Sequence, residues 1–163
     1  MVVHFGGMYL PETAKEKYDP TCPWVPFDSP KSRKVRLALE MAVDKQAIQQ
    51  HILLGYARPQ VLTSFEPGSV FSDPSWKIIP YDPQKAKELL SEAGYPRGFE
   101  KPITMWKMIM PGREEVQDVA EAVAQYWEKN LGLTVKRRVI EYGPVKAVWR
   151  DRADAWICFT YRW

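Results

Sequence analysis

Two histidines and two cysteines are the side chains of this sequence that could bind a metal ion or act as nucleophiles. His4 lies in an apolar stretch and His51 in a helical one, and neither has an HExxH motif or a second ligand pair nearby. Cys22 and Cys158 are far apart and follow no metal-binding or redox spacing. A single disulfide and two free thiols agree equally well with this pattern. We therefore expect no metal ion and no cofactor.

The carboxylates form no catalytic arrangement either. Most stand at expected helix starts or on polar helix faces, while Glu141 and Asp154 lie near strand ends, where a surface position is favoured over a ligand contact. No GxSxG motif, phosphate-binding glycine loop or GxGxxG motif is present, and Gly6-Gly7 is too short to be one. Since no nucleophile, base and orienting group come together, the chain is not expected to be an enzyme.

Length and composition indicate a single globular domain. The 163 residues can bury a core, and 45% hydrophobic with 26% charged residues is ordinary for such a domain. The net charge is only +3, and the one dense basic cluster, Lys136-Arg137-Arg138, lies in an alternating strand pattern. A solvated strand face is favoured there, and no nucleic-acid partner is expected. No apolar run approaches the roughly 20 residues of a membrane-spanning helix.

Apolar periodicity predicts an α/β fold. Helices are expected over 32–43, 45–54, 82–93 and 114–130, and strands over 2–10, 103–110, 133–139 and 153–163, with a further short helix over 143–150. The strand–helix–strand order after residue 102 predicts two parallel strands joined by a right-handed crossover. The proline- and aromatic-rich stretch 22–27 is expected to pack on the domain, and 56–80 is a long loop of a kind that often has a function.

The helix over 82–93 has both of its ends specified by sequence. Asp82 can accept hydrogen bonds from the first free N–H groups, and Pro83 fits the first helical position. Gly94 can adopt the left-handed conformation that ends the helix, and Pro96 prevents its continuation. Capping and an apolar stripe explain these residues, so none of them is expected to contact a ligand.

The stretch YDPQKAKELLSEAGYP, residues 81–96, closely resembles a signature of the large solute-binding proteins of ABC importers, the oligopeptide, dipeptide and nickel-binding group known as family 5. SRKVRLALEMAVDKQAI, residues 32–48, is similar to the VRxALxxAIDRxAI segment of that family. The stretches 54–59 and 120–135 and the aromatic strand after Asp154 resemble further family segments in the same order. The resemblance thus extends from about residue 35 to residue 163.

This resemblance implies a fold, an architecture and a function. The fold is a type II periplasmic-binding-protein-like α/β lobe with a mixed sheet flanked by helices. The chain, 1–163, is expected to be a truncated part of the second lobe, because it stops within an aromatic strand and lacks the first lobe. The protein would capture an oligopeptide, or a saccharide, outside the cytoplasm, tethered to the membrane, for an ABC permease. A sensory or regulatory module that reuses the lobe is the alternative.

The resemblance also implies where the solute binds. Four residues align with the family's ligand-contacting strand: Thr160, Tyr161, Arg162 and Trp163. None of them is acidic, whereas the family often has an acidic side chain in this stretch as the partner of a peptide's amino group. The cleft wall near the first strand would involve Phe5 and Gly6, in a segment that departs from the family pattern.

Two further aromatic residues, Trp106 and Tyr142, lie in or beside predicted strands. Their rings could stack on a sugar or on a peptide side chain, or could belong to the core. The identity of the solute stays open at this point.

Overall fold

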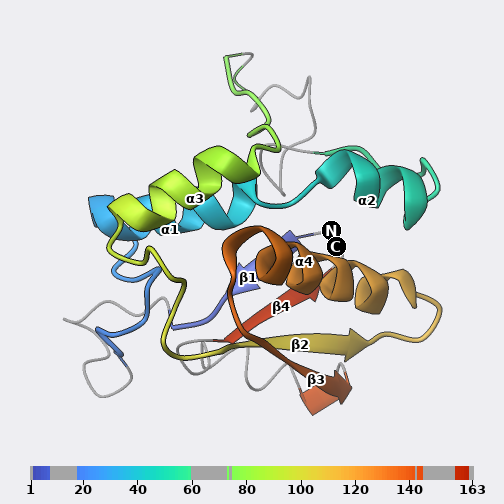
Figure 1. Cartoon of the computed structure of the whole chain (residues 1–163). Coiled ribbons are helices and arrows are strands. Elements are labelled where there is room, and N and C mark those ends of the chain that lie inside the picture. Colours follow the sequence, from blue (N-terminus) through green and yellow to red (C-terminus); the bar gives the residue numbers. More distant parts are fainter. Residues whose placement is uncertain are drawn as a thin grey trace.

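The computed structural model describes residues 2–7, 18–59, 73, 75–141, 143–144 and 157–161. In this part of the chain the order of elements is β1 (Val2–Phe5), α1 (Pro30–Met41), α2 (Lys45–His51), α3 (Pro83–Glu92), β2 (Ile103–Ile109), α4 (Glu115–Leu131), β3 (Val135–Glu141) and β4 (Ile157–Tyr161). Figure 1 shows a layered arrangement, in which α4 lies between the sheet and the pair formed by α1 and α3.

The described strands form one mixed sheet in the order β1-β4-β2-β3. β2 is parallel to β3 from the Ile103–Val135 pair to the Ile109–Glu141 pair, and it is parallel to β4 on its other side. β1 is antiparallel to β4, and Val2 pairs with Tyr161. The predicted mixed sheet and the parallel strand–helix–strand unit are confirmed.

The inner layer is α4, whose apolar stripe forms much of the core. Its buried apolar residues are Val116, Val119, Ala120, Val123, Ala124, Trp127 and Leu131. Gly132, at φ +66°, ends the helix in the left-handed conformation and donates its N–H to the Glu128 carbonyl. The helix predicted over 114–130 is therefore confirmed, with its ends shifted by one residue.

The outer helices begin and end largely as their sequences predict. The N–H of Lys85 donates to Asp82 Oδ1 at 2.8 Å, and Gly94 after α3 has φ +90°. Asp44 caps α2 in the same way, since its Oδ1 accepts from the N–H of Ala47 at 2.9 Å. Each cap satisfies a donor that has no partner within its own helix.

Two side chains of α4 join it to the end of α1. The indole of Trp127 donates to the Leu39 carbonyl at 2.9 Å, and the amide of Asn130 donates to the Ala42 carbonyl at 2.7 Å. Both carbonyls belong to the last turn of α1 and the residue after it, where helices lack internal donors. These bonds fix the helical layer over α4.

The segment before α1 packs on the domain, as predicted. Cys22, Trp24 and Val25 are buried, and the indole of Trp24 donates to the Gly6 carbonyl at 2.9 Å. Arg36 of α1 donates to the carbonyl of Trp24 at 2.9 Å and also to that of Phe27.

Several predictions differ from the structure. β1 ends at Phe5, so Gly6 and Gly7 lie beyond the strand, and 8–10 of its predicted range lie outside the described residues. α2 ends at His51 instead of residue 54, and the turn after it contains Leu54 and Gly55 with positive φ angles of 48° and 82°. Cys22 and Cys158 are both buried and are not joined in a disulfide, which selects the alternative of two thiols. Most of the short helix predicted over 143–150 lies outside the described residues.

Candidate functional site

The carboxyl ends of three parallel strands meet at one edge of the sheet. β2, β4 and β3 end at Ile109, Tyr161 and Glu141, and in Figure 1 the arrowheads of β2 and β4 point to the same side of the molecule. In open α/β sheets, ligands bind outside this edge, where loops leave the strands. The edge is therefore the candidate site, and Tyr161 lies directly at it.

Of the residues predicted to bind solute, Thr160 and Tyr161 are the last two residues of β4. Tyr142 directly follows β3, and Arg162 and Trp163 directly follow β4; these three lie outside the described residues. The strand order places the end of β2 between the ends of β3 and β4. The sheet thus gives Thr160 and Tyr161 a common edge with the end of β3.

Phe5 and Gly6 are not brought to this edge. Phe5 pairs with Cys158, three residues or about 10 Å along β4 from Tyr161. The Phe5 ring stacks on Trp127 at 6.1 Å between ring centroids and lies 5.1 Å from that of Trp24. Because the Gly6 carbonyl accepts the Trp24 indole N–H, both residues take part in core packing at the other end of β1.

Trp106 occupies the middle of β2, away from the candidate site. It pairs with Arg138 on β3 and with Phe159 on β4, and it packs against a small apolar cluster that includes Met108 and Val116. Its indole nitrogen is buried without a hydrogen-bond partner in the described part of the chain. A solute contact by Trp106 remains a prediction.

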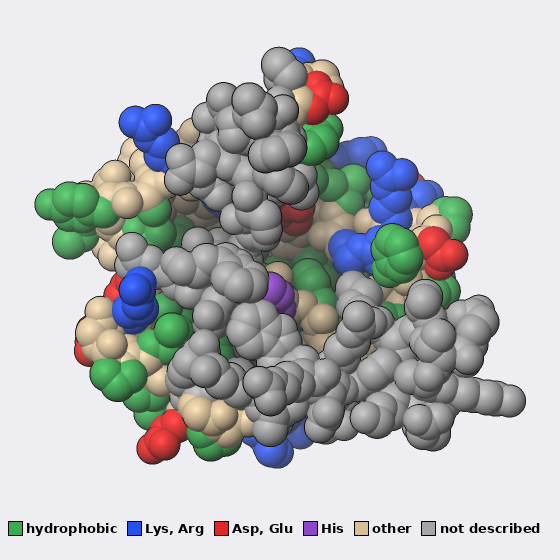
Figure 2. Space-filling model, turned by 180° about the vertical axis from the view of Figure 1, so that it is seen from behind, with side chains coloured by type: hydrophobic (Ala, Val, Ile, Leu, Met, Phe, Trp, Pro, Cys, Tyr) green, Lys and Arg blue, Asp and Glu red, His purple; other side chains and the backbone are tan. Residues whose placement is uncertain are grey.

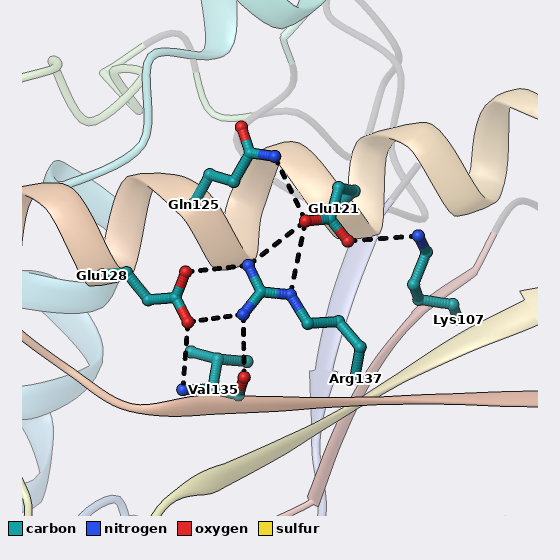
Figure 3. A network of polar contacts seen from close by, with 6 residues as sticks. All are labelled: Lys107, Glu121, Gln125, Glu128, Val135 and Arg137. Carbon is teal, nitrogen blue, oxygen red and sulfur yellow. Dashed lines mark hydrogen bonds and ion pairs between the residues drawn. The ribbon is translucent and has the colours of Figure 1, made fainter.

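A charged network fixes the strands that lead to the candidate site (Figure 3). Arg137 on β3 donates through both terminal nitrogens to the Glu128 carboxylate of α4, with Nη2–Oε2 at 2.8 Å. It also donates to Glu121 Oε1 at 3.2 and 3.3 Å, and Lys107 on β2 lies 3.1 Å from Glu121 Oε2. The network therefore connects β2 and β3 to the same helix.

Sequence reasoning missed this role of Arg137. The interpretation of Lys136-Arg137-Arg138 as a solvated strand face is correct for Lys136 and Arg138, which are exposed. Arg137 is half-buried between two carboxylates, and the only signal was its alternation toward the buried face. Its partners lie 9 and 16 residues away on α4.

The electrostatics of the network follow from these contacts. Hydrogen bonds from Arg137 hold the pKa of Glu128 below its ordinary value. Burial acts to raise the pKa of Glu121, but hydrogen bonds from Lys107, Gln125 and Arg137 outweigh it, so this pKa is also lowered. The same carboxylates raise the pKa of Arg137. Glu121, Glu128 and Arg137 therefore all stay ionised at neutral pH, as a structural network of ion pairs requires.

The described residues offer no other chemical centre. Among them, no group of three or more His, Cys, Asp or Glu could hold a metal ion. Burial lowers the pKa of His4 and raises that of the Cys158 thiol, which keeps both side chains uncharged. Within the same residues, no helix has the length and apolar character needed to cross a bilayer.

Comparison with known proteins identifies relatives. At 39% identity over 115 residues, the chain matches the glutathione-binding protein GsiB of Salmonella typhimurium, across 70% of the chain and 20% of the relative. The chain therefore spans about a fifth of the length of the curated relatives that it matches.

Solved structures agree with the fold. The periplasmic binding protein DppA of Helicobacter pylori, in complex with the peptide STSA, matches with a TM-score of 0.67 and 25% identity, over 99% of this chain and 28% of that one. The binding protein AgaA of A. tumefaciens R10, in complex with agropinic acid, matches with a TM-score of 0.68 and 24% identity, over 98% and 28%. The predicted periplasmic-binding-protein fold is confirmed.

The family assignment rests on a match along most of the sequence. The model of "Bacterial extracellular solute-binding proteins, family 5 Middle" matches residues 19–163. Its members bind solutes, which agrees with the chain not being an enzyme. Because the family model matches nearly the whole chain and the layered α/β fold agrees with it, this chain belongs to the bacterial extracellular solute-binding proteins of family 5.

Proposed function

We propose that this chain is part of the second lobe of a two-lobe protein that captures a small solute outside the cytoplasm and delivers it to an ABC importer. The observation that carries the proposal is the family match over residues 19–163, on a sheet whose parallel strands end at one edge. The full-length protein would be tethered to the membrane, so that bound solute stays close to the permease.

The proposed solute contacts are at the end of β4 and just beyond it. Thr160 and Tyr161 end the strand, and Arg162 and Trp163 follow it, with Tyr142 after the neighbouring end of β3. Aromatic rings supply broad apolar surface, while hydroxyl and guanidinium groups orient a polar ligand. Phe5 and Gly6 would support the sheet rather than touch the solute, since Phe5 stacks on Trp127 and Gly6 binds Trp24.

A short peptide is the solute class with the best support. The relative at 39% identity is described as glutathione-binding, and DppA was solved with the peptide STSA. Both ligands combine amide groups with a terminal carboxylate, and Arg162 could pair with such a carboxylate. A saccharide is supported by the aromatic residues alone and serves as the comparison in the test.

The test uses the full-length protein that contains this chain, titrated by calorimetry with reduced glutathione, the peptide Ser-Thr-Ser-Ala and maltose. Binding of at least one peptide is expected, and Tyr161→Ala should weaken it about tenfold or more through lost ring contact. Phe5→Leu is the matched control, because it should lower the unfolding temperature while leaving the dissociation constant unchanged. Binding lost with Phe5→Leu but kept with Tyr161→Ala would contradict the proposed site.

A further inference from the structure

The turn that follows α2 carries two large apolar side chains that are exposed to solvent. Leu54 is 71% exposed and Tyr56 is 92% exposed, and only Gly55 separates them. Single exposed apolar residues are common on protein surfaces, whereas exposed apolar residues close together form the kind of patch from which contact surfaces are built. We refer to Leu54, Gly55 and Tyr56 as the α2 turn.

The α2 turn has a defined conformation. The N–H of Gly55 donates to the Gln49 carbonyl at 2.9 Å, and the N–H of Tyr56 donates to that of Leu53 at 2.8 Å. Leu54 has φ +48°, a left-handed conformation that costs a non-glycine residue about 1 kcal/mol. A fixed turn presents its two side chains with little loss of conformational entropy when a partner binds.

The position of α2 limits what the partner can be. Of the seven residues of α2, only Ile48 is buried, and three, Gln46, Gln50 and His51, are exposed. Figure 1 shows α2 extending on the side of the molecule toward which the arrowheads of β2 and β4 point. That side holds the candidate solute site, and a lobe that closes over the solute must approach it from there.

We infer that the α2 turn is a docking surface for the other lobe of the same protein, with Leu54 and Tyr56 packed against it. This inference rests on the proposed two-lobe function. The occupant would be part of the polypeptide outside these 163 residues, since the matched relatives are about five times longer than the matched part. Apolar contacts beside the solute would favour the closed arrangement without touching the solute.

The test replaces Tyr56 by the photo-reactive p-benzoylphenylalanine in the full-length protein. Illumination of the protein, without solute and with each peptide in turn, should give in at least one of these samples a cross-link within one polypeptide, from position 56 to a residue outside 1–163, identified by mass spectrometry of the peptides. The matched control is the same replacement at Phe27, which is 62% exposed and lies three residues before α1. It should give no such cross-link.

A cross-link from position 56 only to another copy, or none at all, would overturn the inference. As a second measurement, a Leu54→Ser, Tyr56→Ser variant should lower affinity for whichever of the two peptides binds by roughly tenfold, since the closed state loses two apolar contacts. An unchanged peptide affinity in that variant would also contradict the inferred docking surface. Failure of both peptides to bind the unmodified protein would instead contradict the proposed function.

Discussion

At the scale of single residues, Arg137 shows how a charged side chain can hold two structural layers together. Its planar guanidinium donates to both oxygens of Glu128 and to one oxygen of Glu121. A lysine could offer only a compact ammonium group in this place, without the geometry needed for paired bonds. The position of β3, and through Lys107 that of β2, depends on this network.

Arg137→Lys should therefore lower the free energy of unfolding by about 1 kcal/mol, since the network is half-exposed and partly screened by water. Arg138→Lys is the matched control, because Arg138 is an exposed neighbour on the same strand. Urea unfolding followed by tryptophan fluorescence measures both values. Equal effects of the two substitutions would show that the paired bonds contribute nothing.

The pH dependence of stability follows from Glu128. Its pKa in the folded protein lies below the ordinary 4.5, because Arg137 hydrogen-bonds to the ionised form. The stabilisation is thus fully present above about pH 4.5 and is lost as the pH falls through the lowered folded-state value. Glu128→Gln should be less stable at pH 7 and should lose less stability between pH 5 and pH 3. Parallel pH profiles for both proteins would contradict this assignment.

At the scale of elements, helix boundaries depend on caps that the sequence contains. Asp82 accepts from the Lys85 N–H at 2.8 Å, and the pair formed by α3 and α1 depends on where α3 begins. Asp82→Ala should lower the free energy of unfolding by about 1 kcal/mol, whereas Asp82→Asn should keep most of the stability. Thermal unfolding of the two variants measures this, and an equal loss in both would show that the hydrogen bond has no role.

Local signals of this kind made most elements predictable from sequence. Asp44, Asp82 and Gly132 act through their own backbone neighbourhood, so their effects are independent of the rest of the fold. α2 was predicted to run to residue 54, but it ends at His51, and the left-handed conformation of Leu54 that follows has no sequence signal.

Contacts between distant elements were harder to predict. The bonds from Trp127 to Leu39 and from Asn130 to Ala42 each span 88 residues. The family resemblance predicts Phe5 at the cleft wall; strand pairing places it opposite Cys158, with its ring against Trp127. Strand order and register determine which end of a strand faces a ligand, and neither follows from local sequence.

At the scale of the whole molecule, the proposed architecture makes this chain one side of a binding site. Its sheet carries the carboxyl ends of β2, β3 and β4 at one edge, and its relatives are several times longer. In the proposed architecture, a solute is enclosed only when a second lobe covers it, and most of its surface is buried in that state. The affinity would come from both lobes together.

The most direct test of this account compares solute binding by the full-length protein and by the 163-residue chain. Both are titrated by calorimetry with reduced glutathione and with Ser-Thr-Ser-Ala, after circular dichroism has shown that each is folded. We predict that the full-length protein binds at least one peptide and that the isolated chain binds it roughly a hundredfold more weakly, a difference of about 2.7 kcal/mol. Equal affinity of the two proteins for the same peptide would contradict the shared site.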